Sequence, residues 1–166
     1  MPIKIAINGF GRIGRCSLKI ALENPNLDVV AINDLSGPAV LAHLFKYDTS
    51  YGIYSKDVFV EIDGKKRALE SWDKSKEYYS LASTKDSYLI IGDKRIKFVS
   101  EKDPNLLPWK ELEVDVVLEC TGRFTKDGSA KAHLDAGAKK VVISSPVSGE
   151  GGVPTFLMGV NSDVYL

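Results

Sequence analysis

The chain has 166 residues, of which 44% are hydrophobic and 27% are charged. These proportions are typical of a soluble globular domain and exclude intrinsic disorder and collagen-like repeats. Its 22 Lys+Arg residues balance 22 Asp+Glu residues, so no net charge favours binding to nucleic acid or to an anionic membrane. The length predicts one domain over residues 1–166. Two cysteines far apart, no signal peptide and no apolar run of about 20 residues favour a cytoplasmic protein without disulfides or membrane spans.

The first 33 residues predict a strand, a glycine-rich turn, a helix and a second strand. The strands are residues 3–8 and 27–33, short apolar runs rich in β-branched residues. The helix runs from Arg12 to Glu23 and ends before Asn24-Pro25. Its expected apolar stripe consists of Ile13, Cys16, Ile20 and Ala21, broadened by Leu18 and Leu22. Together these segments predict a right-handed parallel βαβ unit.

The middle of the chain predicts a helix followed by antiparallel strands. The helix covers residues 38–46, with Ser36 or Gly37 near its N-cap and Pro38 as its first residue. Residues 58–62, 88–91 and 95–99 alternate around turns in the manner of antiparallel strands. The polar segment 65–85 between them is either an excursion of the chain or a short amphipathic piece.

The last third returns to strands that alternate with a helix. Strands are expected at residues 114–119 and 140–144, with a helix over 129–136 that Gly137 closes. A final apolar run, residues 156–160, reads as one more strand. The sequence therefore predicts an α/β fold: a Rossmann-type doubly wound, mainly parallel sheet with an antiparallel excursion in residues 55–100. No helix follows the last run, which suggests that further protein covers this edge of the sheet.

The turn after the first strand carries the pattern G-x-G-x-x-G, from Gly9 through Phe10, Gly11, Arg12 and Ile13 to Gly14. In this context, glycines permit a tight turn, a close approach of the backbone to a pyrophosphate, and close packing of helix on sheet. The helix N-terminus then offers unpaired N–H groups to the anion. The alternative is that the glycines only shape the turn.

Asp34 follows the second strand, twenty positions after Gly14. A carboxylate at this place accepts hydrogen bonds from the adenosine ribose, and its charge repels the 2′-phosphate of NADP. The combination of glycines, strand and acid predicts NAD as the cofactor. The alternative is a solvated acid or a helix N-cap.

Several segments of the sequence resemble phosphorylating glyceraldehyde-3-phosphate dehydrogenase. The first matching segments are Asn8 to Arg15 and Ala31 to Leu35. Further matches are residues 41–52, 101–104 with 108–109, 119–125, 137–144 and 158–161. Their order and spacing match nearly the whole chain, although erythrose-4-phosphate dehydrogenase shares most of them.

The resemblance implies a set of NAD-binding residues. Arg12 and Ile13 would offer backbone N–H groups to the pyrophosphate, Asp34 would hold the ribose, and Lys102 would lie by the adenine. The adenosine side would be lined by Thr121, Gly122 and Phe124, and Ser144 would lie near the nicotinamide ribose. The expected set is Asn8, Gly9, Phe10, Gly11, Arg12, Ile13, Asp34, Lys102, Thr121, Gly122, Phe124 and Ser144.

The family's catalytic residues are not expected in this chain. They are a cysteine nucleophile in a Ser-Cys-Thr-Thr-Asn segment, which would begin just after Leu166, and a later histidine base. Cys120 and Cys16 are interpreted as packing residues, and His43 and His133 as structural or surface residues without an acidic or thiol partner. No metal-ligand spacing exists. Residues 66–84 look like an insertion in the family's antiparallel region.

The resemblance thus implies the NAD-binding part of a glycolytic enzyme. The complete protein would be a cytoplasmic homotetramer, and it would oxidise glyceraldehyde 3-phosphate with inorganic phosphate to 1,3-bisphosphoglycerate while NAD is reduced. The isolated chain is expected to be inactive. The alternatives are a stand-alone NAD-binding module without catalysis and the first part of erythrose-4-phosphate dehydrogenase. A nucleic-acid binder, suggested by the basic runs 65–67 and 139–140, is disfavoured by zero net charge.

Overall fold

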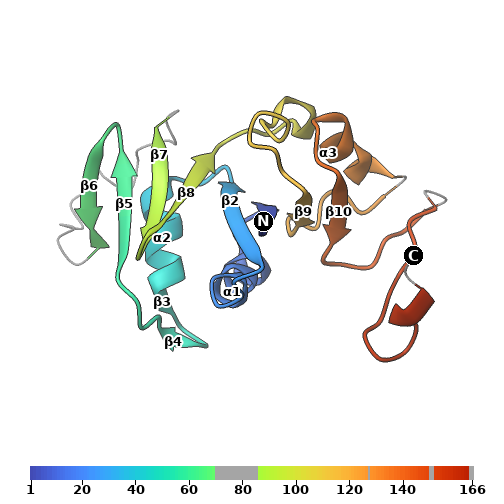
Figure 1. Cartoon of the computed structure of the whole chain (residues 1–166), viewed down its shortest axis with the longest axis horizontal. Helices are drawn as coiled ribbons and strands as arrows, with labels where there is room; N and C mark the ends of the chain where they lie inside the picture. The colour runs from blue at the N-terminus through green and yellow to red at the C-terminus, as the bar shows by residue number, and fades with distance from the viewer. Residues whose placement is uncertain (70–85, 127, 150–151, 165–166) are drawn as a thin grey trace.

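A computed structural model describes residues 1–69, 86–126, 128–149 and 152–164 of the chain (Figure 1). Its centre is an eight-stranded sheet in the order β10-β9-β1-β2-β8-β7-β5-β6. The strands from β10 to β8 are parallel to one another, and the strands from β8 to β6 are antiparallel. The prediction of an α/β fold with a mainly parallel sheet and an antiparallel excursion is therefore confirmed.

The first βαβ unit forms as predicted. Strand β1 (Ile3–Asn8) and strand β2 (Leu27–Asn33) pair in parallel, joined by helix α1 (Arg12–Ala21). The Asn24 side chain accepts a hydrogen bond from the Asn26 backbone at 3.0 Å. Pro25 between them lacks the N–H that a continued helix would need. The chain therefore leaves α1 in a tight turn and enters β2 directly.

The apolar stripe expected on α1 is partly wrong. The buried side of the helix consists of Gly14, Leu18 and Ala21, spaced four and three residues apart. Ile13 and Ile20 are 55% and 72% exposed. A Cβ on Gly14 would lie 2.2 Å from the carbonyl oxygen of Gly9, so the helix meets the sheet through its glycine. That close approach turns the two isoleucines outward.

Helix α2 (Pro38–Lys46) has the predicted bounds, with Gly37 as its N-cap and Pro38 at its start. A small hairpin of β3 (Tyr47–Asp48) and β4 (Gly52–Ile53) follows it. The antiparallel part of the sheet consists of β5 (Val58–Ile62), β6 (Lys65–Ala68), β7 (Ser87–Ile91) and β8 (Lys94–Val99). Most of the expected insertion at 66–84 lies outside the described residues.

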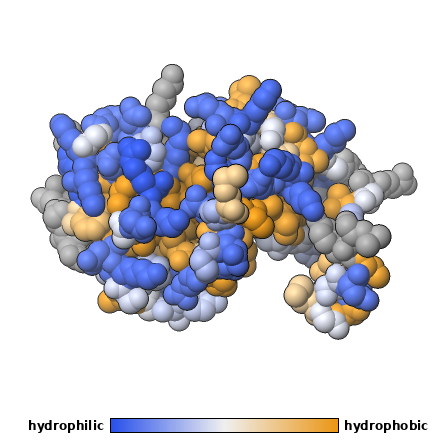
Figure 2. All heavy atoms as spheres, viewed as in Figure 1, coloured by the Kyte–Doolittle hydropathy of each residue, from blue (hydrophilic) through white to orange (hydrophobic). Residues whose placement is uncertain are grey.

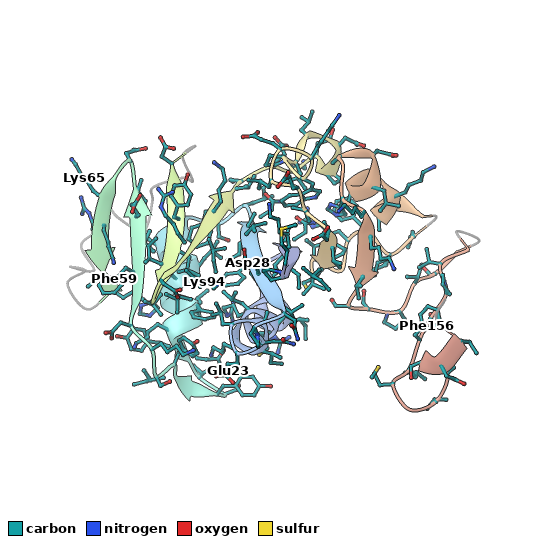
Figure 3. The ribbon with its side chains drawn as sticks, in the orientation of Figure 1. Glu23, Asp28, Phe59, Lys65, Lys94 and Phe156 are labelled. Carbon is teal, nitrogen blue, oxygen red and sulfur yellow. The ribbon has the colours of Figure 1, made fainter. Side chains whose placement is uncertain are left out.

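Strand β8 joins the two parts of the sheet because it pairs with β2 in parallel and with β7 in antiparallel fashion. An ion pair supports this junction, because the Lys94 ammonium lies 2.9 Å from the Asp28 carboxylate. Figure 3 labels both residues. The chain then passes through a 3-10 turn, η2 (Pro104–Leu106), to the far side of β1.

The last part of the sheet contains β9 (Val116–Glu119) and β10 (Lys140–Ile143). The helix expected between them is a 3-10 turn, η3 (Ser129–Lys131), that continues as the short helix α3 (Ala132–Asp135). Gly137 ends it in a left-handed conformation, as predicted, and its N–H donates to Leu134. The sheet thus has one core cluster around Phe10, Phe45 and Leu18, and a second around Trp109 and Val117.

The strand expected at residues 156–160 is absent. Pro154 precedes the run and Gly159 adopts a positive φ of 75°. The side chain of Asn161 accepts from the Leu157 N–H at 2.6 Å and donates to the Thr155 carbonyl at 3.0 Å, which closes the chain into a turn. The apolar side chains remain exposed, and the segment, which ends in the 3-10 turn η4 (Ser162–Val164), stands away from the sheet (Figures 1 and 2).

Candidate functional site: a dinucleotide pocket

A cavity of about 530 Å³ opens where the parallel strands end. Its walls come from the ends of β1, β2 and β9 and from the loop after β8. The chain places β2 on one side of β1 and β9 on the other, and such a switch point is where open α/β sheets bind ligands. The lining residues are Asn8, Gly9, Gly11, Asn33, Asp34, Leu35, Glu101, Lys102, Cys120, Thr121, Arg123 and Phe124.

The glycine-rich turn forms the floor of the pocket, and the steric surroundings of its three glycines differ. Gly9 has a φ of 91°, and a Cβ there would lie 2.8 Å from the backbone nitrogen of Thr121. Gly14 lets α1 touch the turn, as described above. A Cβ on Gly11 would meet nothing within 4 Å. The protein's own packing therefore does not require glycine at position 11. A ligand that approaches the backbone closely there would require it.

The N-terminus of α1 lies at the edge of this space, because its N-cap residue Gly11 lines the pocket. Gly11 is the N-cap residue and supplies no side-chain acceptor. Arg12 and Ile13, the first residues of the helix, are exposed. The uncapped helix end carries a partial positive charge. This arrangement suits a pyrophosphate, whose oxygens would accept from the open N–H groups.

Asp34 lies at the end of β2 and lines the same pocket. One carboxylate oxygen accepts from the Phe10 N–H at 2.8 Å, and the other accepts from the Ser36 N–H at 2.9 Å. Each carboxylate oxygen has capacity for a further hydrogen bond. The side chain therefore both fastens the glycine-rich turn and offers acceptors to hydroxyl groups in the pocket.

The wall opposite Asp34 rests on a buried acid that was not among the predicted binding residues. Glu119, the last residue of β9, has no exposed surface, and its carboxylate lies 2.9 Å from the His133 imidazole. The expectation that His133 has no acidic partner is wrong. The two residues are 14 positions apart and meet only because α3 packs back over the end of β9. His133 is fully buried, which agrees with the expected structural role.

Most residues of the predicted set gather around the pocket. Those that line it are Asn8, Gly9, Gly11, Asp34, Lys102, Thr121 and Phe124. Arg12, Ile13 and Gly122 are exposed beside it, and the Ser144 hydroxyl donates a hydrogen bond to the Cys120 sulfur. The Phe10 side chain points away into the core and stacks on Phe45. Only the backbone of Phe10 faces the site.

The pocket also contains residues outside the predicted set: Asn33, Leu35, Glu101, Cys120 and Arg123. Each neighbours a predicted residue in the sequence, and that adjacency was the available signal. Cys120 is half-buried and packs on the core, as expected. Burial raises the pKa of its thiol, so Cys120 stays neutral rather than becoming a nucleophilic thiolate. Cys16 is half-buried on α1.

Metal binding and membrane insertion find no support in the part of the chain that the structure describes. Within the described ranges, no group of His, Cys, Asp or Glu side chains is arranged to hold a metal ion. Among the helices of the same ranges, none has the length and apolarity that crossing a bilayer requires.

A dinucleotide fits the residues present. The open space over Gly11, the uncapped helix end and the free acceptors of Asp34 lie along one cavity. These three features correspond to the pyrophosphate and ribose of a bound dinucleotide.

Comparison with known proteins agrees with this geometry. Residues 3–75 and 71–127 match the family model described as "Glyceraldehyde 3-phosphate dehydrogenase, NAD binding domain". The chain is 45% identical over 160 residues to glyceraldehyde-3-phosphate dehydrogenase of Clostridium pasteurianum, covering 96% of this chain and 40% of that protein. Identity to the same enzyme of Geobacillus stearothermophilus is 43% over 165 residues, covering 99% and 42%. The chain spans about two fifths of the length of these relatives, and it belongs to the NAD-binding domain family of glyceraldehyde-3-phosphate dehydrogenase.

Proposed function

We propose that this chain binds NAD in the pocket at the ends of β1, β2 and β9. The observation that carries the proposal is the bond from the Phe10 N–H to Asp34. This bond joins the glycine-rich turn, which suits a pyrophosphate, to the Asp34 carboxylate, which suits a ribose, within one cavity. The negative charge of Asp34 opposes a 2′-phosphate, which favours NAD over NADP.

The proposed roles follow the positions of the residues. The N–H groups of Arg12 and Ile13 hold the pyrophosphate, and Gly9 and Gly11 leave room for it. Asp34 accepts from the adenosine ribose, while Lys102, Thr121, Gly122 and Phe124 flank the adenine. Ser144 lies toward the nicotinamide ribose. NAD, when bound, supplies the acceptor for a hydride, and the chain's part is to hold and orient it.

We further propose that the chain is the cofactor part of a phosphorylating glyceraldehyde-3-phosphate dehydrogenase. The complete protein would act on glyceraldehyde 3-phosphate with inorganic phosphate in the cytoplasm, as a homo-oligomer. The identity to full-length enzymes over nearly the whole chain supports this assignment. The nucleophile and the base would come from residues outside 1–166, and residues 1–166 would form the NAD-binding domain.

Calorimetric titration of the protein at its natural length with NAD and with NADP tests the first proposal. We expect NAD to bind more tightly than NADP. In the variant Gly11→Val the added Cβ meets no protein atom within 4 Å, although valine suits an N-cap less well than glycine. The variant should therefore stay folded, with at most a small fall in melting temperature, and lose at least tenfold in NAD affinity. Glu111→Val, an exposed substitution outside the pocket, is the control and should bind as the unaltered protein does. Equal NAD affinity in Gly11→Val would overturn the proposed pyrophosphate position.

A further inference from the structure

The buried pair of Glu119 and His133 is more elaborate than packing requires. The Glu119 carboxylate accepts from four donors: the His133 imidazole at 2.9 Å, the Asn8 amide at 2.5 Å, the Thr121 N–H at 2.7 Å and the Thr121 hydroxyl. A carboxyl group that accepts from all of these is ionised. Among the described residues, the only basic side chain within ion-pair distance of Glu119 is His133.

The tautomer of His133 is fixed by its other neighbour. The Trp109 indole N–H, which can only donate, lies 3.0 Å from Nδ1 of His133. Nδ1 is therefore the acceptor, and Nε2 carries the proton that it donates to Glu119. Both ring nitrogens are occupied, and the neutral imidazole acts as a spacer between the indole and the carboxylate.

The pair supports one wall of the pocket directly. Glu119 receives both the N–H and the hydroxyl of Thr121, and the Phe124 ring stands edge-on to the His133 ring, with centroids 5.8 Å apart. Thr121 and Phe124 both line the cavity. Thr121 is also the residue that packs against Gly9 of the glycine-rich turn. A shift of the pair would therefore move the wall and the turn together.

The same carboxylate is linked to the opposite wall. Asn8 donates to Glu119 and accepts from the Asn33 amide at 2.7 Å. Asn33 also donates to the Glu101 carbonyl at 2.9 Å and accepts from the Glu101 N–H at 2.8 Å. This holds the loop that carries Glu101 and Lys102, both of which line the pocket. One continuous chain of hydrogen bonds thus joins the two walls beneath the cavity.

We propose that Glu119 and His133 are positioning residues for the adenosine half of NAD, because they fix Thr121 and Phe124 against the glycine-rich turn. The inference rests on the proposed NAD site. A buried carboxylate without a cationic partner costs stability that apolar packing would not. Its four donors instead give a single defined position to the wall, and this is how pre-organisation raises affinity.

The test compares two substitutions of His133 in the protein at its natural length. His133→Gln keeps an N–H donor for Glu119, whereas His133→Leu removes it, and both lose the imidazole. We expect the NAD dissociation constant to rise about tenfold more in His133→Leu than in His133→Gln, because a wall that is no longer held in place must be ordered when NAD binds. The dissociation constant of ADP-ribose, which lacks the nicotinamide, should rise by the same factor. In steady-state assays the effect should appear in KM for NAD and not in kcat.

A second variant avoids the core. Thr121→Val keeps the shape beside Gly9 and removes the hydroxyl that donates to Glu119, and it should also weaken NAD and ADP-ribose binding several-fold. Melting temperatures are measured for every protein. If both His133 variants melt earlier but bind NAD equally well, and Thr121→Val binds as the unaltered protein does, the pair only stabilises the fold and the inference is wrong. If the unaltered protein itself binds no NAD, the proposed function fails, and the inference fails with it.

Discussion

Asp34 and Phe10 are 24 residues apart, yet the carboxylate of the first accepts the backbone N–H of the second at 2.8 Å. This bond ties the end of β2 to the glycine-rich turn after β1. The residue that we propose selects the ribose therefore also sets the shape of the turn that we propose receives the pyrophosphate. A substitution of Asp34 should act on both halves of the site.

The first prediction concerns the charge of Asp34. Asp34→Asn keeps the size of the side chain and an acceptor for Phe10, but it removes the negative charge. NAD affinity should fall about tenfold, because hydrogen bonds to charged groups contribute about 1.5–3 kcal/mol and neutral ones less. NADP affinity should rise, since the repulsion of its 2′-phosphate is removed. Titration calorimetry with both cofactors measures the ratio.

Asp34→Ala is the matched comparison, because it also removes the acceptor for the Phe10 N–H. It should lose more NAD affinity than Asp34→Asn. A NAD-to-NADP preference that does not change in either variant would show that Asp34 does not face the ribose.

The second prediction separates two glycines of the same motif. Gly14→Ala places a Cβ 2.2 Å from the Gly9 carbonyl oxygen, which is backbone and cannot move aside, whereas Gly11→Ala meets nothing within 4 Å. Overpacking of this kind costs about 1–3 kcal/mol. Urea unfolding should therefore show Gly14→Ala less stable by about that amount. Gly11→Ala should lose less, because only the weaker N-cap preference of alanine counts against it. Equal stabilities would mean that α1 can withdraw from the turn without cost.

Local sequence patterns were enough for the elements that form from neighbouring residues. The bounds of β1, β2 and α2 match the prediction because apolar runs, and the start signal Pro38 of α2, act within a few residues. The glycine motif and Asp34 were found for the same reason. The pocket's principal residues can thus be predicted from short stretches of sequence.

Features that depend on distant contacts were missed. The exposure of Ile13 and Ile20 follows from the contact of Gly14 with Gly9. The spacing of apolar residues alone does not show which face of the helix packs on the sheet. The strand expected at 156–160 gave way to a turn that the Asn161 side chain closes. The bond of His133 to Glu119 likewise requires α3 to fold back on β9, and no local pattern predicts it.

The third prediction concerns acid. Burial raises the pKa of Glu119, but the bonds from His133, Thr121 and Asn8 outweigh it, so the pKa lies below its usual value of 4.5. The unfolded chain therefore takes up this proton at higher pH than the folded one. The stability that the ionised carboxylate contributes is present above the unfolded pKa and is lost as the pH falls through the folded pKa.

Urea unfolding of the unaltered protein and of Glu119→Gln, from neutral to acidic pH, checks this. At neutral pH the variant should be about 2 kcal/mol less stable, since an amide must place N–H groups against other donors. The difference should shrink as the pH falls through the folded pKa of Glu119. Other carboxyl groups with lowered pKa values, such as Asp48 and Asp115, are present in both proteins and cancel. The imidazole of His133 faces the same carboxylate, so the comparison is repeated in His133→Gln; a difference that stays constant with pH would contradict the prediction.

The fourth prediction is that residues 1–166 alone bind NAD but do not oxidise glyceraldehyde 3-phosphate. Neither cysteine can serve as the nucleophile: Cys16 lies on α1 outside the pocket, and burial raises the pKa of the Cys120 thiol. Nor is a base at hand, because His133 has both ring nitrogens occupied and His43 lies on α2, away from the cavity. With glyceraldehyde 3-phosphate, phosphate and NAD, the absorbance of NADH should not rise above that of a blank without protein. A NAD titration of the same preparation serves as the control for folding. Production of NADH that depends on glyceraldehyde 3-phosphate would place a nucleophile within these residues and overturn the assignment of catalysis to another part of the protein.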